Sequence, residues 1–336
     1  MTERLEHGGD AAEAEALFGR PQDGWLDLST GINPYHYPLK TMELKHLLHL
    51  PDSGLFEDLR RAAADCYGVS DPALVVPAPG TQALIQWLPR LRARSRVTVL
   101  GPTYNEHAHA WRLAGHAVEE RAVQEGDGLD GLKELSGVVV CVNPNNPDGR
   151  ILKADELVDL AARLARRGGL LVVDEAFSDV APEISVAAKA GAPGLVALRS
   201  FGKFFGLAGV RLGFALTGPE LAGPLIHALG PWAVSGPAAA VGARALSDEK
   251  WISETRERLK REAVRLAGLL KDNGMEEVGG TDLFRLVQSP KGPDIHARLA
   301  KRGVLVRKFS ERPNWLRFGL PGDEDDWRLL EQALQE

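Results

Sequence analysis

The feature that most constrains the fold is a series of short apolar runs, each followed by an amphipathic stretch. The apolar runs cover 74–77, 97–100, 138–142, 170–173, 195–198 and 212–216, and helix-like stretches cover 55–67, 82–92, 104–114 and 155–167. Short apolar runs are typical of strands that are buried on both faces, and their alternation with helices is typical of a parallel sheet. We therefore predict an α/β fold with a large domain built on a mostly parallel, doubly wound sheet.

The pattern changes after about Gly218, where a long charged helix is predicted over Asp248–Lys271. Strand-like segments at 283–287, 304–307 and 316–320 and a closing helix follow it. At 336 residues and 44% hydrophobic composition the chain is long enough for two cores. We predict a large domain over 41–217 and a smaller α+β C-terminal domain over 218–336. Residues 1–40, broken by Gly and Pro, are expected to form an N-terminal arm that packs on the active site or the small domain.

Composition excludes some classes of partner. The net charge of -6 arises from 46 acidic and 40 basic residues with no basic run, so no nucleic-acid partner is expected. Cys66 and Cys141 lack metal-ligand spacing, so no metal is expected. Residues 1–10 are charged and no apolar stretch is long enough to span a bilayer, so we expect a cytoplasmic protein without a membrane partner.

Ligands of an open parallel sheet bind beyond the carboxyl ends of its strands, so the residues after each apolar run are candidates for a site. Gly80, Thr81 and Gln82 follow the first run and begin a predicted helix, where free N–H groups and the helix dipole form an anion site. Thr81 as a plain helix cap explains the same residues equally well.

Three further strand ends carry polar or aromatic residues. Tyr104 follows 97–100, where it could stack on a planar ring or serve packing alone. Residues 143–149 contain two Asn-Pro pairs and a final Gly, which predict a rigid loop suited to a site. Asp174 ends the run at 170–173, where a buried carboxylate requires a cationic partner or a shifted pKa.

Lys203 follows the run at 195–198 and is surrounded by Phe201, Phe204 and Phe205. A Lys among apolar side chains loses its proton readily and can attack a carbonyl, whereas a surface Lys that reaches solvent fits these neighbours poorly. An anion cradle, a stacking aromatic, a carboxylate for a pyridinium N–H and an amine for an aldehyde together indicate pyridoxal 5'-phosphate.

Asn146-Pro147-x-Gly149, Asp174, Ser200-x-x-Lys203 and Arg211 resemble the motifs of the fold type I pyridoxal-phosphate enzymes, the class I/II aminotransferase family. The resemblance extends over nearly the whole chain. It implies that Lys203 holds the cofactor as a Schiff base and that Asp174 pairs with the ring nitrogen. It also implies that Asn146 donates to the phenolic oxygen of the ring.

For the remaining cofactor contacts, the resemblance implies stacking by Tyr104 and phosphate binding by Gly80, Thr81, Gln82, Ser200 and Arg211. Arg317 stands where the family places the Arg that binds the substrate carboxylate. The resemblance implies that Arg307, Arg317, His7 and Asn33 divide the substrate's phosphate and carboxylate between them, and the sequence does not assign which residue takes which group. For His7 and Asn33 a purely structural role in turns is an equal alternative.

Within the family, the chain is most similar to the branch of threonine-phosphate decarboxylases and histidinol-phosphate aminotransferases. The segment His7-Gly8-Gly9-Asp10, the segment 27–34 and the segment 199–203 resemble the decarboxylases, and Phe177 stands where the aminotransferases usually have Tyr. The resemblance implies decarboxylation of L-threonine O-3-phosphate to (R)-1-amino-2-propanol O-phosphate and CO2, in cobalamin biosynthesis. The alternative is a histidinol-phosphate aminotransferase. Retention of Lys203 and Asp174 disfavours a non-catalytic cofactor-binding protein.

The family builds its active site at a dimer interface, so the resemblance also implies a homodimer. Leu50 departs from the family pattern, because many relatives have a Tyr there that reaches the neighbouring subunit's cofactor phosphate.

Overall fold

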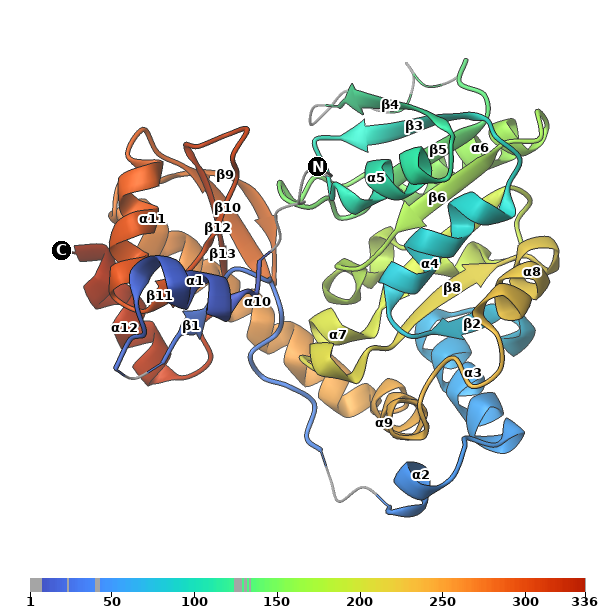
Figure 1. Ribbon diagram of the computed structural model, residues 1–336, viewed down its shortest axis with the longest axis horizontal. Helices are drawn as coiled ribbons and strands as arrows, with labels where there is room; N and C mark the ends of the chain where they lie inside the picture. The colour runs from blue at the N-terminus through green and yellow to red at the C-terminus, as the bar shows by residue number, and fades with distance from the viewer. Residues whose placement is uncertain are drawn as a thin grey trace. The chain divides into compact units, whose positions relative to one another are not determined.

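The computed structural model describes residues 8–22, 24–39, 43–123, 129, 132 and 134–335. The chain divides into two compact units (Figure 1). The large unit comprises Tyr37–Asn146 and Arg150–Ser253, and the small unit comprises the residues up to His36, Pro147–Gly149 and Glu254–Glu336.

A seven-stranded sheet in the described part of the large unit has the order β2-β8-β7-β6-β5-β3-β4. Its strands are β2 (Val75–Ala78), β3 (Arg96–Gly101), β4 (Ala117–Ala122), β5 (Val138–Val142), β6 (Leu170–Asp174), β7 (Leu195–Ser200) and β8 (Gly213–Thr217). Strand β8 runs antiparallel to β2 and β7, and the remaining pairs are parallel. All residues of β5 and β6 are buried, which explains why these strands are continuous apolar runs.

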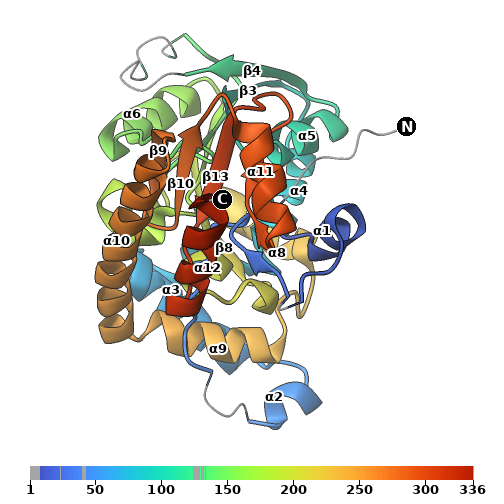
Figure 2. The same cartoon turned by 90° about the vertical axis from the view of Figure 1, so that its left-hand side faces the viewer.

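Helices cover both faces of this sheet, with α4 and α5 on one face and α6 on the other (Figures 1 and 2). The α-helices of the large unit are α2 (Lys45–Leu48), α3 (Ser53–Tyr67), α4 (Thr81–Trp87), α5 (Glu106–Leu113), α6 (Ala154–Ala165), α7 (Phe201–Phe204), α8 (Pro219–Leu229) and α9 (Gly236–Leu246). Helix α3 begins where the Asp52 carboxylate accepts from Leu55 N and ends at Gly68, whose φ is 69°. The predicted doubly wound arrangement is confirmed.

The small unit holds an antiparallel sheet of order β12-β13-β10-β9. Its strands are β9 (Glu276–Thr281), β10 (Phe284–Gln288), β12 (Arg307–Lys308) and β13 (Trp315–Gly319), and its helices are α1 (Ala11–Phe18), α11 (Gly292–Lys301), α12 (Glu324–Gln335) and most of α10 (Glu249–Asp272). Helix α11 packs against α12 and β13 (Figure 2). The N-terminal strand β1 (Leu26–Asp27) pairs in parallel with β11 (Val304–Leu305). The residues of the expected N-terminal arm up to His36 therefore belong to the small unit, to which they contribute strand β1.

The division between the units differs from the expected boundary at Gly218, because residues up to Ser253 belong to the large unit. Helix α8 buries Leu221 and Leu225 and contacts β2, β8 and α4, and helix α9 contacts α3. These apolar faces bind the two helices to the large core. None of the helices in the described ranges is long and apolar enough to cross a membrane.

Candidate active site

The predicted phosphate cradle brings together residues from three strand ends. Gly80 precedes α4 with φ 80°, and a Cβ built on it would lie 2.7 Å from Arg211 Nη2. A Cβ on Gly213 would lie 2.7 Å from Thr81 N, and Gly213 is the register partner of Ser200. The start of α4, Ser200 and the exposed Arg211 are therefore neighbours. Only a residue without Cβ allows this approach of the guanidinium to the helix start.

The Gln82 side chain has another role, because its Nε2 donates to Glu106 Oε2 at 2.5 Å. Glu106 is buried at the first position of α5. This contact joins α4 to α5, so only the backbone N–H of Gln82 is left for the predicted phosphate contact. That N–H is one of the groups at the start of a helix that have no intrahelical acceptor.

Asp174 is buried at the end of β6, where its Oδ2 lies 2.8 Å from Nε2 of the buried His107. Its Oδ1 accepts from Ala176 N at 3.1 Å. The sequence predicts a cationic partner or a shifted pKa for this carboxylate, but it does not identify His107 as the residue in contact. No spacing within one segment identifies His107, because the contact joins α5 to the end of β6.

The Tyr104 ring meets the imidazole of His107 edge to face, with centroids 6.1 Å apart and planes at 83°. Tyr104 is partly exposed and precedes α5. His107 thus contacts both Tyr104, the candidate for stacking on a ring, and the Asp174 carboxylate.

The loop after β5 is held by two of its asparagines. The Asn143 side chain exchanges hydrogen bonds with the Leu152 backbone, at 2.8 Å from Leu152 N and 3.0 Å to Leu152 O. Asn145 Nδ2 donates to Pro102 O at 2.9 Å, and its Oδ1 accepts from Thr103 Oγ1 at 2.6 Å. Both side chains are buried, whereas Asn146 is partly exposed. Its role as a donor to the cofactor stays a prediction that this rigid loop suits.

Lys203 lies in the short helix α7 with buried aromatic neighbours. Its Nζ is 5.5 Å from the ring centroid of Phe177, which is 3% exposed. Phe201 and Phe204 on the same helix are also buried. The aromatic surroundings predicted for this amine are thus present. They leave the amine in place for reaction with an aldehyde.

Arg307 and Arg317 face each other across β12 and β13, where they are direct register partners. Arg317 is 5% exposed, and its Nη2 donates to Ser29 O at 2.7 Å. Burial and the positive charge of Arg307 lower the pKa of Arg317 to about 9, and Asp27 opposes this shift. Two cations at this spacing repel, so an acidic ligand would stabilise them.

The other two predicted substrate residues belong to the N-terminal segment. His7 lies outside the described residues. Gly9 N donates to Ser29 Oγ at 2.8 Å, so the start of the segment packs beside the residue that contacts Arg317. Asn33 is buried, with Oδ1 accepting from Tyr35 N at 2.8 Å and Nδ2 donating to Tyr35 O at 3.1 Å. These are contacts of a turn-forming residue, and its substrate role stays a prediction.

The residues of the large unit fit pyridoxal 5'-phosphate. The backbone at Gly80 approaches a guanidinium, a buried carboxylate has an imidazole partner, and an amine lies among aromatic rings. This donor set matches the cofactor's phosphate, ring nitrogen and aldehyde. Among the described residues, no group of three or more His, Cys, Asp or Glu side chains is placed to hold a metal ion.

Known proteins resemble this chain in both sequence and fold. Residues 25–334 match the aminotransferase class I and II family. The chain is 47% identical over 331 residues to a threonine-phosphate decarboxylase of Pseudomonas aeruginosa, covering 98% of this chain and 97% of the relative. It is 28% identical over 328 residues to a histidinol-phosphate aminotransferase of Citrifermentans bemidjiense, covering 94% and 92%.

The crystal structure of histidinol-phosphate aminotransferase from Sinorhizobium meliloti in complex with pyridoxal-5'-phosphate superposes with a TM-score of 0.82 at 23% identity, covering 98% of this chain and 94% of that one. At this identity the likeness shows the fold alone. The sequence matches extend over nearly the whole chain, and the chain therefore belongs to the aminotransferase class I and II family.

Proposed function

We propose that this protein is a pyridoxal 5'-phosphate-dependent carboxy-lyase that converts L-threonine O-3-phosphate to (R)-1-amino-2-propanol O-phosphate and CO2. The observation that carries the proposal is the 47% identity, over 98% of the chain, to a threonine-phosphate decarboxylase. The match to a histidinol-phosphate aminotransferase is much lower, at 28% identity. The product is a phosphorylated amino alcohol, which we assign to cobalamin biosynthesis in the cytoplasm.

The bound cofactor supplies an electron-withdrawing ring that stabilises negative charge at the substrate's Cα. Asp174 keeps the proton on the ring nitrogen, and His107 orients that carboxylate through the 2.8 Å contact. Lys203 would hold the cofactor's aldehyde before the substrate amine binds, and its ammonium form would donate a proton to the substrate's Cα as a general acid. The buried Phe177 excludes water beside the amine and has no O–H to donate.

We assign recognition of the substrate's acidic groups to Arg307 and Arg317. Threonine phosphate carries a carboxylate and a phosphate, and the paired arginines offer two guanidinium forks for them. A buried guanidinium left without its anion is costly, so unphosphorylated threonine is discriminated against by on the order of 10⁴-fold. The residues that hold the carboxylate would orient the substrate's Cα, and this orientation would decide between decarboxylation and proton loss.

The deciding experiment measures both products from threonine phosphate. The purified holoenzyme is incubated with and without 2-oxoglutarate, and CO2 and glutamate are quantified. Release of CO2 that does not depend on the keto acid supports the proposal, whereas glutamate formation without CO2 supports aminotransfer. Histidinol phosphate serves as the alternative substrate in the same assay. Loss of the imine absorbance in Lys203→Ala is required by either activity, and its persistence would refute the assignment of Lys203.

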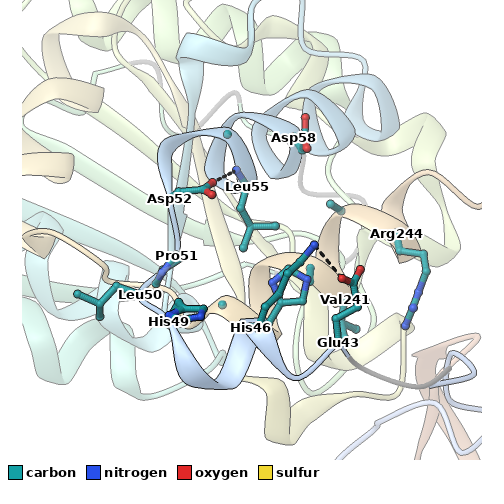
Figure 3. A pocket seen from close by; sticks show the side chains of 15 residues that line it. Glu43, His46, His49, Leu50, Pro51, Asp52, Leu55, Asp58, Val241 and Arg244 are labelled. Atoms are coloured by element: carbon teal, nitrogen blue, oxygen red, sulfur yellow. Dashed lines mark hydrogen bonds and ion pairs between the residues drawn. The ribbon is translucent and has the colours of Figure 1, made fainter.

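We further propose that the enzyme is a homodimer whose interface includes α2. Leu44, Leu47, Leu48 and Leu50 are each at least 64% exposed, and neighbouring apolar side chains of this kind are typical of an association surface. A pocket of 670 Å³ in the same part of the chain is lined by residues of 43–58 and 236–244 (Figure 3). Leu50 lies at the rim of this pocket. A second copy of the chain is the occupant that the family resemblance favours.

A further inference from the structure

A buried ionic cluster lies directly behind the residues assigned to the cofactor. Arg199 Nη1 is 3.0 Å from Glu175 Oε2, and Arg199 Nη2 is 2.6 Å from Asp179 Oδ1. The guanidinium also stacks on the ring of Tyr67, 4.3 Å from its centroid. Arg199, Glu175 and Asp179 are at most 2% exposed. One cation is therefore shared by two carboxylates out of reach of solvent.

Two members of the cluster are adjacent in the chain to a residue of the candidate site, and the third lies two residues from one. Glu175 follows Asp174, Arg199 precedes Ser200, and Asp179 comes two residues after Phe177. Side chains alternate between the faces of a strand, so Arg199 and Ser200 at the end of β7 point to opposite faces. Glu175 follows β6 and Asp179 lies in the 3₁₀ turn Ser178–Val180, so the cluster holds the segments that present the site residues.

Backbone contacts fix the two strand ends to one another at this position. Glu175 N donates to Leu198 O at 2.8 Å, which extends the pairing of β6 with β7. The Glu175 carboxylate also accepts from Ser185 Oγ at 2.5 Å and from Val186 N at 2.6 Å. Ser178 Oγ, one residue before Asp179, donates to Asn143 O at 2.7 Å. Three strand ends that contribute to the site are consequently linked.

Stability alone does not explain such a cluster. Removing three ionised groups from water is expensive, and well-packed apolar side chains of similar volume are often equally stabilising. Burial raises the pKa of Glu175, although Arg199, Ser185 and Val186 oppose the shift. What a hydrogen-bonded ionic cluster provides beyond an apolar one is a defined geometry.

We propose that Arg199 is a positioning residue that, by joining Glu175 to Asp179, sets the place of Asp174 and Phe177 relative to Lys203. The proposal builds on the proposed function, because it assigns Asp174 to the ring nitrogen and Lys203 to the aldehyde. Displacement of catalytic groups by about 1 Å costs up to about 100-fold in rate. Loss of the guanidinium fork therefore affects the reaction more than substrate binding.

The test compares Arg199→Lys with Arg265→Met and wild-type holoenzyme. Lys keeps the charge but replaces the two-pronged fork with a single ammonium. Arg265 is the matched control, since it also contacts two carboxylates, Glu324 and Glu331, and stacks on the Trp327 ring. Measured quantities are the cofactor dissociation constant, the pH midpoint of the imine absorbance, kcat, KM and Tm.

For Arg199→Lys we expect about a tenfold weaker cofactor affinity, a displaced imine midpoint and a kcat reduced about 10- to 100-fold, with KM changed less than about twofold. Arg265→Met should leave all four of these values near wild type. If Arg199→Lys lowers only Tm while the midpoint, the cofactor affinity and kcat stay at wild-type values, the cluster is merely structural and the proposal is wrong.

A second variant covers the case in which Arg199→Lys does not fold. Arg199→Met, Glu175→Gln and Asp179→Asn together remove all three charges while the amides keep hydrogen-bonding groups in place. We expect this variant to fold with a displaced imine midpoint, and an unchanged midpoint and cofactor affinity would overturn the proposal. These two readouts need no substrate, so they remain decisive even if threonine phosphate proves not to be turned over, which would defeat the proposed function alone.

Discussion

His107 Nε2 lies 2.8 Å from Asp174 Oδ2, with both side chains buried at the end of β6. The contact gives the carboxylate a fixed orientation in a place where few other groups can solvate it. Whatever Asp174 binds, its affinity depends on this imidazole, because a buried charge that loses its hydrogen-bond partner bears its full desolvation cost.

We expect His107→Phe to weaken cofactor binding by about tenfold or more, since an unsatisfied buried group costs about 1–3 kcal/mol. The measurement is a titration of the apoenzyme with pyridoxal 5'-phosphate. His116→Phe is the control, because His116 is also buried and its contacts with Ser95 N at 3.2 Å, Pro89 O at 2.9 Å and the Trp111 ring involve no residue assigned to the cofactor. That variant should lower stability without changing cofactor affinity. Equal losses in both variants would contradict a specific role for His107.

The strands of the large sheet were predictable from sequence because burial on both faces produces uninterrupted apolar runs. Strand β5 occupies Val138–Val142, as predicted. Strand β4 (Ala117–Ala122) was not predicted, because this edge strand is mostly exposed and contains charged residues. Helices α8 and α9 were expected in the small domain, since their sequences do not reveal which core their apolar faces cover.

The candidate site was predictable to the extent that its residues follow strands. A parallel sheet gathers the carboxyl ends of its strands at one edge, so Asp174 and Lys203 could be grouped without a structure. The partners of these residues could not. His107 and the Arg199 cluster depend on side chains that meet across elements, and no spacing in one segment records such a meeting.

Gly80→Ala tests the phosphate cradle. The substitution places a side chain at φ 80° and a Cβ 2.7 Å from Arg211 Nη2, so the guanidinium must move. We expect a loss of about 1–2 kcal/mol in the free energy of unfolding from the left-handed backbone and at least a tenfold loss in cofactor affinity. Gly223→Ala is the control, because nothing lies within 4 Å of its Cβ inside helix α8. It should be neutral or stabilising.

Substrate affinity should fall at alkaline pH through Arg317. Its pKa in the folded protein, about 9, is below its ordinary value of 12.5. The Arg317 charge is therefore present at pH values below about 9, and there the cost of burying it opposes folding. As pH rises through about 9, the charge is lost, and its attraction for an anionic substrate is lost with it. KM for threonine phosphate should rise above about pH 9. In Arg307→Gln the repelling cation is absent, so the midpoint of this rise should move to higher pH even though KM at pH 7.5 is larger.

The homodimer proposal is tested by placing charge on the exposed face of α2. Leu47 is 64% exposed, and Leu47→Glu should shift the enzyme toward monomer in size-exclusion chromatography with light scattering. Val264→Glu, at a residue 65% exposed in α10, is the matched control and should leave the mass unchanged. A wild-type protein that is monomeric at micromolar concentration would contradict the proposal.

Phe177→Tyr tests whether the choice between decarboxylation and aminotransfer depends on the residue beside the amine. Phe177 is buried 5.5 Å from Lys203 Nζ, so the new hydroxyl would sit where this protein has no donor. The aminotransferases that this chain resembles usually have a Tyr here, which donates to the cofactor's phenolic oxygen. If the new hydroxyl donates in the same way, it should change how negative charge is distributed over the cofactor ring. We expect kcat for CO2 release to fall about tenfold, equivalent to about 1.4 kcal/mol, and the ratio of glutamate to CO2 to rise when 2-oxoglutarate is present. Phe204→Tyr, equally buried but packed against Trp251, controls for overpacking. If both variants lose CO2 release equally and neither changes the product ratio, Phe177 acts by packing alone and the choice of reaction is made by the groups that hold the substrate carboxylate.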